Sequence, residues 1–206
     1  MSQREDWITY PGTPEMNVAA EELGNRLNKI WAYGPASERI LTEKWGENHI
    51  VGARGHWTVK QELAKWGMLP LETPIFANKG DTYDFLLPRV GYTDVKTKQL
   101  HSSRIKEPDR VEVNISQKGK PDIYIFCCWH SWNRVMWILG WMPYSDYWNG
   151  GALWRKGEIH EGRKVKASML VRPIVDLRAM NLLRTELIQK HKTTIGRQKG
   201  NAYLRR

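Results

Sequence analysis

Two short segments of the sequence combine carboxylates and a lysine in a pattern that could support phosphodiester hydrolysis. Asp84 begins an apolar run, and Asp94 and Lys96 alternate a few residues later. Side chains two positions apart in a strand point to the same face, so we expect Asp94 and Lys96 to share one charged face. The intervening Val95 would then point to the other face.

A turn between these segments could bring the two aspartates side by side. Pro88 and Gly91 are residues that a hairpin turn favours. Two carboxylates that converge on a strand pair can bind a hard cation such as Mg²⁺ or Mn²⁺. A nearby lysine could orient a water molecule or offset charge on a phosphate. An Asp-x-Lys pattern is also typical of a solvated strand face with a weak ion pair, so the neighbouring elements decide between the two interpretations.

The segment 55–67 is predicted to be a helix that packs beside this hairpin. Apolar residues recur at helical spacing from Val59 to Trp66, and a glycine follows. His56 lies on the apolar stripe, either as a core histidine or as a third metal ligand. Glu62 lies off the stripe and is expected to face solvent.

The order of these features resembles the PD-(D/E)xK nuclease superfamily, the restriction-endonuclease-like fold, over about residues 50–140. Members have a helix that opens with Gly-Glu or a histidine, an Asp on the second strand and an acid-x-Lys motif on the third. The matching positions here are Gly55-His56, Tyr83-Asp84 and Asp94-Val95-Lys96-Thr97. His56 stands where many members carry glutamate, although RecB-like nucleases have a histidine metal ligand in the first motif.

The resemblance implies an α/β (α+β) fold with a mixed central sheet flanked by helices. It also implies a metal-dependent nuclease that cuts DNA, with an endonuclease favoured over an exonuclease, of the stand-alone kind found in phages and mobile elements. Asp84, Asp94 and Lys96 would be catalytic. His56 and the two aspartates would bind Mg²⁺ or Mn²⁺, and the imidazole would favour Mn²⁺. A nuclease acting on RNA is a variant of this prediction.

The net charge of +10 and the pI of about 9.6 favour an anionic partner, with nucleic acid first and DNA ahead of RNA. An alternative is a non-catalytic nucleic-acid-binding protein with a nuclease-like fold. Such a protein would rely on charge and on the eleven tryptophans, which can stack on bases. The candidate nucleic-acid-binding residues are Lys98, Arg104, Lys106, Lys118, Lys120, Lys190, Lys192, Arg197 and Lys199.

The cysteine content and hydropathy favour a cytoplasmic protein without a membrane partner. No segment is long and apolar enough to span a bilayer, and no N-terminal signal pattern is present. Cys127 and Cys128 are adjacent in an apolar run, which is typical of core residues in a reducing compartment.

The chain divides into three regions. Residues 1–50 are expected to form an N-terminal arm and helices packed on the core, 51–175 the nuclease-like core, and 176–206 a C-terminal helix and basic tail. We expect the first helix from Glu15 to about Trp31, with Val18 among its core positions. Further strands are predicted at 111–115, 122–129, 134–141 and 166–171, with a helix after Pro173.

Overall fold

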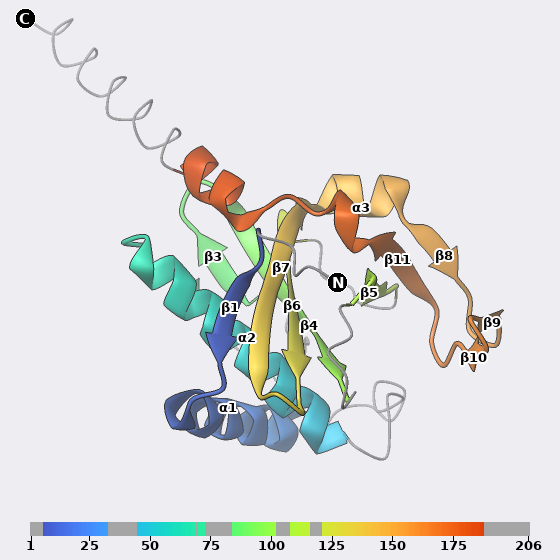
Figure 1. Ribbon diagram of the computed structural model, residues 1–206, viewed down its shortest axis with the longest axis horizontal. Coiled ribbons are helices and arrows are strands. Elements are labelled where there is room, and N and C mark those ends of the chain that lie inside the picture. The colour runs from blue at the N-terminus through green and yellow to red at the C-terminus, as the bar shows by residue number, and fades with distance from the viewer. Residues whose placement is uncertain are drawn as a thin grey trace, which may run out of the picture.

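The computed structural model describes residues 6–32, 45–68, 70–72, 84–101, 108–115 and 121–187. At its centre lies a six-stranded sheet with the strand order β1-β7-β6-β4-β3-β2 (Figure 1). Among these strands, β4 and β6 run parallel and the other neighbouring pairs are antiparallel. The fold is therefore the predicted α/β (α+β) class with a mixed sheet. The strands are β1 (Ile8–Pro11), β2 (Leu71–Glu72), β3 (Phe85–Leu87), β4 (Gly91–Leu100), β6 (Ile123–His130) and β7 (Val135–Pro143).

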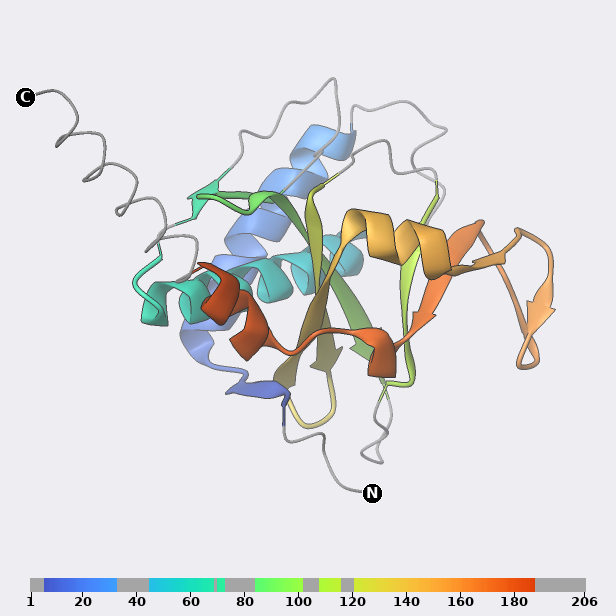
Figure 2. The ribbon, with the colours of Figure 1, turned by 90° about the horizontal axis from the view of Figure 1, so that it is seen from above.

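Helices cover one face of this sheet. Helix α2 (Trp45–Lys65) lies against the strands, and α1 (Pro14–Ala32) packs on α2 (Figure 2). Val59 and Leu63 of α2 are fully buried with Ile125 and Ile138 of the sheet. Because this apolar stripe recurs every three or four residues, its burial against the sheet fixes the orientation of α2.

A second layer covers the opposite face. It consists of a three-stranded sheet of order β5-β11-β8, built from β5 (Arg110–Asn114), β8 (Ala152–Trp154) and β11 (Met169–Pro173), together with helix α3 (Tyr144–Gly150). Tyr124 and Phe126 of β6 form the core beneath it with Tyr147 of α3. The hairpin of β9 (Ile159–His160) and β10 (Arg163–Lys164) extends from this layer at one end of the molecule (Figure 1).

Several predicted elements are confirmed. The β3–β4 hairpin forms where Pro88 and Gly91 were expected to turn the chain, and α1 spans the predicted helix. Strands β5, β6 and β7 occupy the predicted positions. Helix α2 begins ten residues earlier than predicted, at Trp45 instead of Gly55, so it crosses the expected boundary between residues 50 and 51.

At the two ends of the described chain, the structure differs from the prediction, although the C-terminal helix is present with a later start. The expected N-terminal arm contains β1, which pairs with β7 at the edge of the sheet. Val18 is 56% exposed, whereas Met16, Ala20 and Gly24 of α1 are buried. After Pro173 the chain forms a 3-10 turn, η2 (Ile174–Asp176), and a bridge to β7, and the helix covers residues 180–187.

Candidate active site

The β3–β4 hairpin brings the two predicted aspartates together. Its register pairs Phe85 with Thr93, which places Asp84 opposite Asp94. The Asp84 N–H donates to the Thr93 carbonyl at 2.9 Å, and Asp84 Oδ2 accepts a hydrogen bond from the Val95 N–H at 2.6 Å. The Asp84 carboxylate is thus held by the backbone of the strand that carries Asp94.

Lys96 completes a compact group with these acids. Its Nζ lies 2.6 Å from Asp94 Oδ2, and the two side chains are only 19% and 15% exposed. Val95, between them, is buried in the core under α2. The predicted alternation is therefore correct, and Asp94 and Lys96 lie on the face that α3 and the three-stranded sheet cover.

The two carboxyl groups repel each other when both are charged. The pKa of Asp84 is raised to about 8, first because burial disfavours the charged form and then because of the neighbouring Asp94 carboxylate. The Val95 N–H and the Lys96 ammonium act in the opposite direction, but do not cancel this rise. Near neutral pH, Asp84 therefore holds a proton at the contact between the two acids.

Aromatic residues line the same face of the sheet. Tyr124 of β6 is the register partner of Asp94. Burial raises the pKa of the Tyr124 phenol, the hydrogen bond from Trp148 lowers it, and the Asp94 charge raises it, so the net effect is a raised pKa. Trp148 Nε1 donates to the Tyr124 hydroxyl at 3.3 Å, and its ring lies 5.6 Å from that of Tyr144. Trp148 thus packs beside the site and is half-buried there.

His56 lies on the other side of the sheet. Its ring stacks on Phe85 with the ring centroids 4.3 Å apart, and Phe85 belongs to the core beneath α2. Asp94 points to the opposite face. No group of three His, Cys, Asp or Glu side chains that could hold a metal ion occurs within the described ranges. The structure brings Asp84, Asp94 and Lys96 together, but it does not add His56 to them.

Glu62 was predicted to face solvent, and this prediction was wrong. The residue is only 8% exposed, and its carboxylate accepts hydrogen bonds from the Tyr10 hydroxyl at 2.6 Å and from Trp66 Nε1 at 2.9 Å. Lys65 Nζ lies 3.3 Å from Glu62 Oε2. Because Tyr10 belongs to β1, this cluster joins the edge strand to α2.

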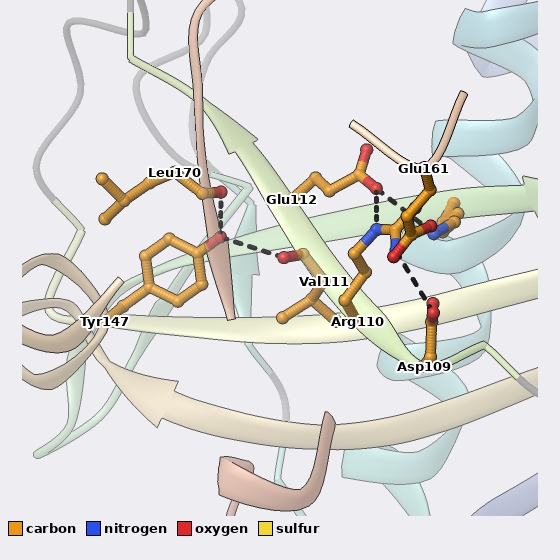
Figure 3. A network of polar contacts seen from close by, with 8 residues as sticks. Asp109, Arg110, Val111, Glu112, Tyr147, Glu161 and Leu170 are labelled. Atoms are coloured by element: carbon orange, nitrogen blue, oxygen red, sulfur yellow. Dashed lines mark hydrogen bonds and ion pairs between the residues drawn. The ribbon is translucent and has the colours of Figure 1, made fainter. Parts of the chain in front are cut away.

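A charged network centred on Arg110 of β5 was not predicted. Arg110 contacts Glu112 at 3.1 Å and Glu161 at 2.6 Å, and Asp109 also pairs with it (Figure 3). Lys98, a predicted nucleic-acid-binding residue, lies 3.4 Å from Glu112. The alternation of Arg110 and Glu112 in a half-buried strand was the sequence signal for these contacts. The other candidate basic residues lie outside the described residues: Arg104, Lys106, Lys118, Lys120, Lys190, Lys192, Arg197 and Lys199.

The adjacent cysteines are both buried and free. Burial raises the pKa of the Cys128 thiol to about 12 and raises that of Cys127 further. Neither thiol is therefore a thiolate near neutral pH, and both are packed as core residues.

Comparison of the chain with protein-family models, with curated proteins and with solved structures found no match. Within the described part of the chain, no helix combines the length and the apolar character needed to cross a membrane.

Proposed function

We propose that this protein is a metal-dependent nuclease that hydrolyses phosphodiester bonds in DNA, with Asp84, Asp94 and Lys96 at its active site. The observation that carries the proposal is the contact between two half-buried carboxyl groups with a lysine 2.6 Å from one of them. Strongly perturbed acids with a specific charged partner are typical of functional sites.

The donor set suits a hard divalent cation. Asp84 and Asp94 offer carboxylate oxygens, and Mg²⁺ in proteins is commonly held by one or two carboxylates, with water and substrate phosphate as the remaining ligands. A cation would replace the proton at Asp84 and remove the repulsion that raises its pKa. His56 is not needed for this set, so the preference for Mn²⁺ expected from an imidazole ligand does not follow from the contacts seen here.

The roles of the side chains follow from their positions. Asp84 and Asp94 would hold the ion, and Lys96 would place its ammonium beside Asp94, where it can offset charge on the scissile phosphate and orient the attacking water. When bound, the ion would lower the pKa of water and neutralise charge on the phosphate. The backbone N–H of Val95 keeps the Asp84 carboxylate in place, which limits the reorganisation needed for binding.

The order of the elements supports a nuclease of the PD-(D/E)xK kind. After α2, the described strands follow as β2, β3 and β4. Asp84 directly precedes the second of these strands, and Asp94 and Lys96 lie on the third. The net charge of +10 supports a polyanionic substrate.

The test is cleavage of supercoiled, linear and single-stranded DNA, and of RNA, with Mg²⁺, Mn²⁺ or EDTA. The native chain is compared with folded Asp94→Ala and Lys96→Ala variants. We expect cleavage of DNA that requires the ion and is lost in both variants. Equal binding of nucleic acid by all three proteins, without cleavage under any condition, would instead support the non-catalytic nucleic-acid-binding protein.

A further inference from the structure

The β9–β10 hairpin and its flanks form an exposed basic ribbon, defined here as residues 155–166. This segment contains five lysines and arginines and two glutamates, a formal net charge of +3 with His160 neutral. Figures 1 and 2 show that it extends beyond the three-stranded sheet at one end of the molecule. A projecting ribbon with an excess of positive charge is a surface that a polyanion can approach from several sides.

The turn and the backbone pairing make the ribbon rigid. Glu161 and Gly162 have φ angles of 51° and 74°, the positive values that a two-residue type I′ turn requires. The Gly157 N–H donates to the Val165 carbonyl at 2.9 Å, and the Val165 N–H donates to the Glu158 carbonyl at 2.8 Å. The backbone of the ribbon is therefore ordered before binding, so its ordering adds little to the cost of binding.

Both glutamates of the ribbon are occupied by internal partners. Glu158 accepts from the Arg155 N–H at 2.7 Å and lies 3.0 Å from His160 Nε2. Glu161 pairs with Arg110 on β5 at 2.6 Å (Figure 3). In contrast, four cations of the ribbon are exposed, and none of them forms an ion pair with another described residue: Lys156, Arg163, Lys164 and Lys166.

Aromatic contacts fix the ribbon to the layer that covers the candidate active site. The rings of Trp154 and His160 are parallel, with centroids 4.1 Å apart, and the Arg110 guanidinium lies 4.8 Å from the Trp154 ring. Arg110 also contacts Glu112, which pairs with Lys98 of β4. Lys98 shares a strand face with Asp94, so a chain of contacts connects the ribbon to the strand of the site.

From these contacts we infer that the ribbon is a nucleic-acid-binding element that contacts the phosphates of duplex DNA. The major groove is about 12 Å wide and admits a two-stranded β-ribbon, so the cations of this ribbon could meet the phosphates that border a groove. The inference rests on the proposed function, because it assigns a way for the same enzyme to hold its substrate. None of the nucleic-acid-binding residues predicted from the sequence lies in this ribbon.

The experiment measures binding of a fluorescent duplex oligonucleotide in EDTA, as a function of salt, so that no cleavage takes part. The variant is R163Q/K164Q in the full chain, and the matched control is R26Q/K29Q on α1. Arg26 and Lys29 are likewise exposed, and the change in charge is the same. Circular dichroism melts confirm that both variants are folded.

We expect R163Q/K164Q to bind roughly tenfold or more weakly near 0.1 M salt, with the slope of log K against log salt shallower by about 1.8. The control should show a change several times smaller. Equal effects of the two variants, or no binding of duplex by the native chain, would overturn the inference. Loss of binding to anionic phospholipid vesicles without loss of DNA binding would overturn it in favour of a membrane surface. If the ribbon variant loses DNA binding but the native chain never cuts, only the proposed catalysis fails.

Discussion

Two acidic side chains of this protein, the buried Glu62 and the half-buried Asp84, have contrasting neighbours. Glu62 accepts hydrogen bonds from Tyr10 and Trp66 and has Lys65 beside it. Asp84 accepts a hydrogen bond from the Val95 N–H, and its carboxyl group contacts that of Asp94. The first arrangement satisfies its charge and joins two elements of the fold. The second places two carboxyl groups in contact, so that one of them, Asp84, has a raised pKa, and such perturbed acids are typical of functional sites.

The largest contrast should appear between the two lysines that accompany these acids. Lys96→Ala should lower DNA cleavage by about 10²–10³-fold, because the ammonium beside the scissile phosphate is lost. Lys65→Ala removes an equivalent charge from the Glu62 cluster, where Lys65 is 60% exposed, and should change cleavage by less than about twofold. Initial rates of plasmid cleavage check both. Similar losses in the two variants would show that Lys96 acts through general charge and not at the site.

Glu62→Ala should act on stability and not on chemistry. It leaves the Tyr10 hydroxyl and the Trp66 N–H without their acceptor, at a cost of about 2–4 kcal/mol in the free energy of unfolding. Urea denaturation measures this cost, and cleavage by the folded fraction should be unchanged. Asp84→Asn is the counterpart, because the amide oxygen can still accept from Val95 while the repulsion with Asp94 disappears. A destabilisation by Asp84→Asn as large as that by Glu62→Ala would remove the distinction between the two acids.

The raised pKa of Asp84 predicts a pH dependence of stability. With a folded-state pKa of about 8 and an ordinary value of 3.8, the folded state holds more protons than the unfolded state between these limits. The free energy of unfolding should therefore fall as pH rises through this window. Denaturation in EDTA at about pH 6 and about pH 9 should show a smaller fall for Asp84→Asn than for the native chain. An equal fall in both proteins would assign the effect to other groups.

The smallest effect is expected at Lys98, because its ammonium is already engaged by Glu112 at 3.4 Å. Lys98→Gln should cost less than about 1 kcal/mol in the free energy of unfolding. It should also change the salt slope of DNA binding by well under about 1, the value for one lost phosphate contact. A loss of one full unit of slope would show that Lys98 leaves Glu112 to contact DNA.

The sequence predicted the site hairpin because its signals are local. Pro88 and Gly91 give the turn, and alternation assigns Asp94 and Lys96 to one face regardless of what covers it. The proximity of Asp84 and Asp94 follows from the length of that turn. The mixed sheet flanked by helices was predicted from the resemblance to the PD-(D/E)xK superfamily, which itself rests on the local order of these elements.

The missed features depend on contacts distant in sequence. Glu62 is buried because Tyr10 of β1 contacts it, and the N-terminal arm expected from the sequence does not include such a strand. Proline is tolerated on an edge strand, which is the position β1 occupies. The position of His56 likewise depends on Phe85, which packs on the α2 face of the sheet. The positions of Glu62 and His56 therefore could not be predicted from local sequence patterns, because their neighbours are distant in sequence.

The most direct test of the central claim is to measure the binding of Mn²⁺ to the protein, without DNA and above pH 8, by isothermal titration calorimetry. The native chain and Glu62→Gln should bind the ion with equal affinity, and Asp84→Asn and Asp94→Asn should each weaken binding at least about tenfold. Lowering the pH through the pKa of Asp84 should weaken binding to the native chain, because the proton and the ion compete. Absence of Mn²⁺ binding, or binding that survives both aspartate substitutions, would contradict the assignment of Asp84 and Asp94 as a metal site.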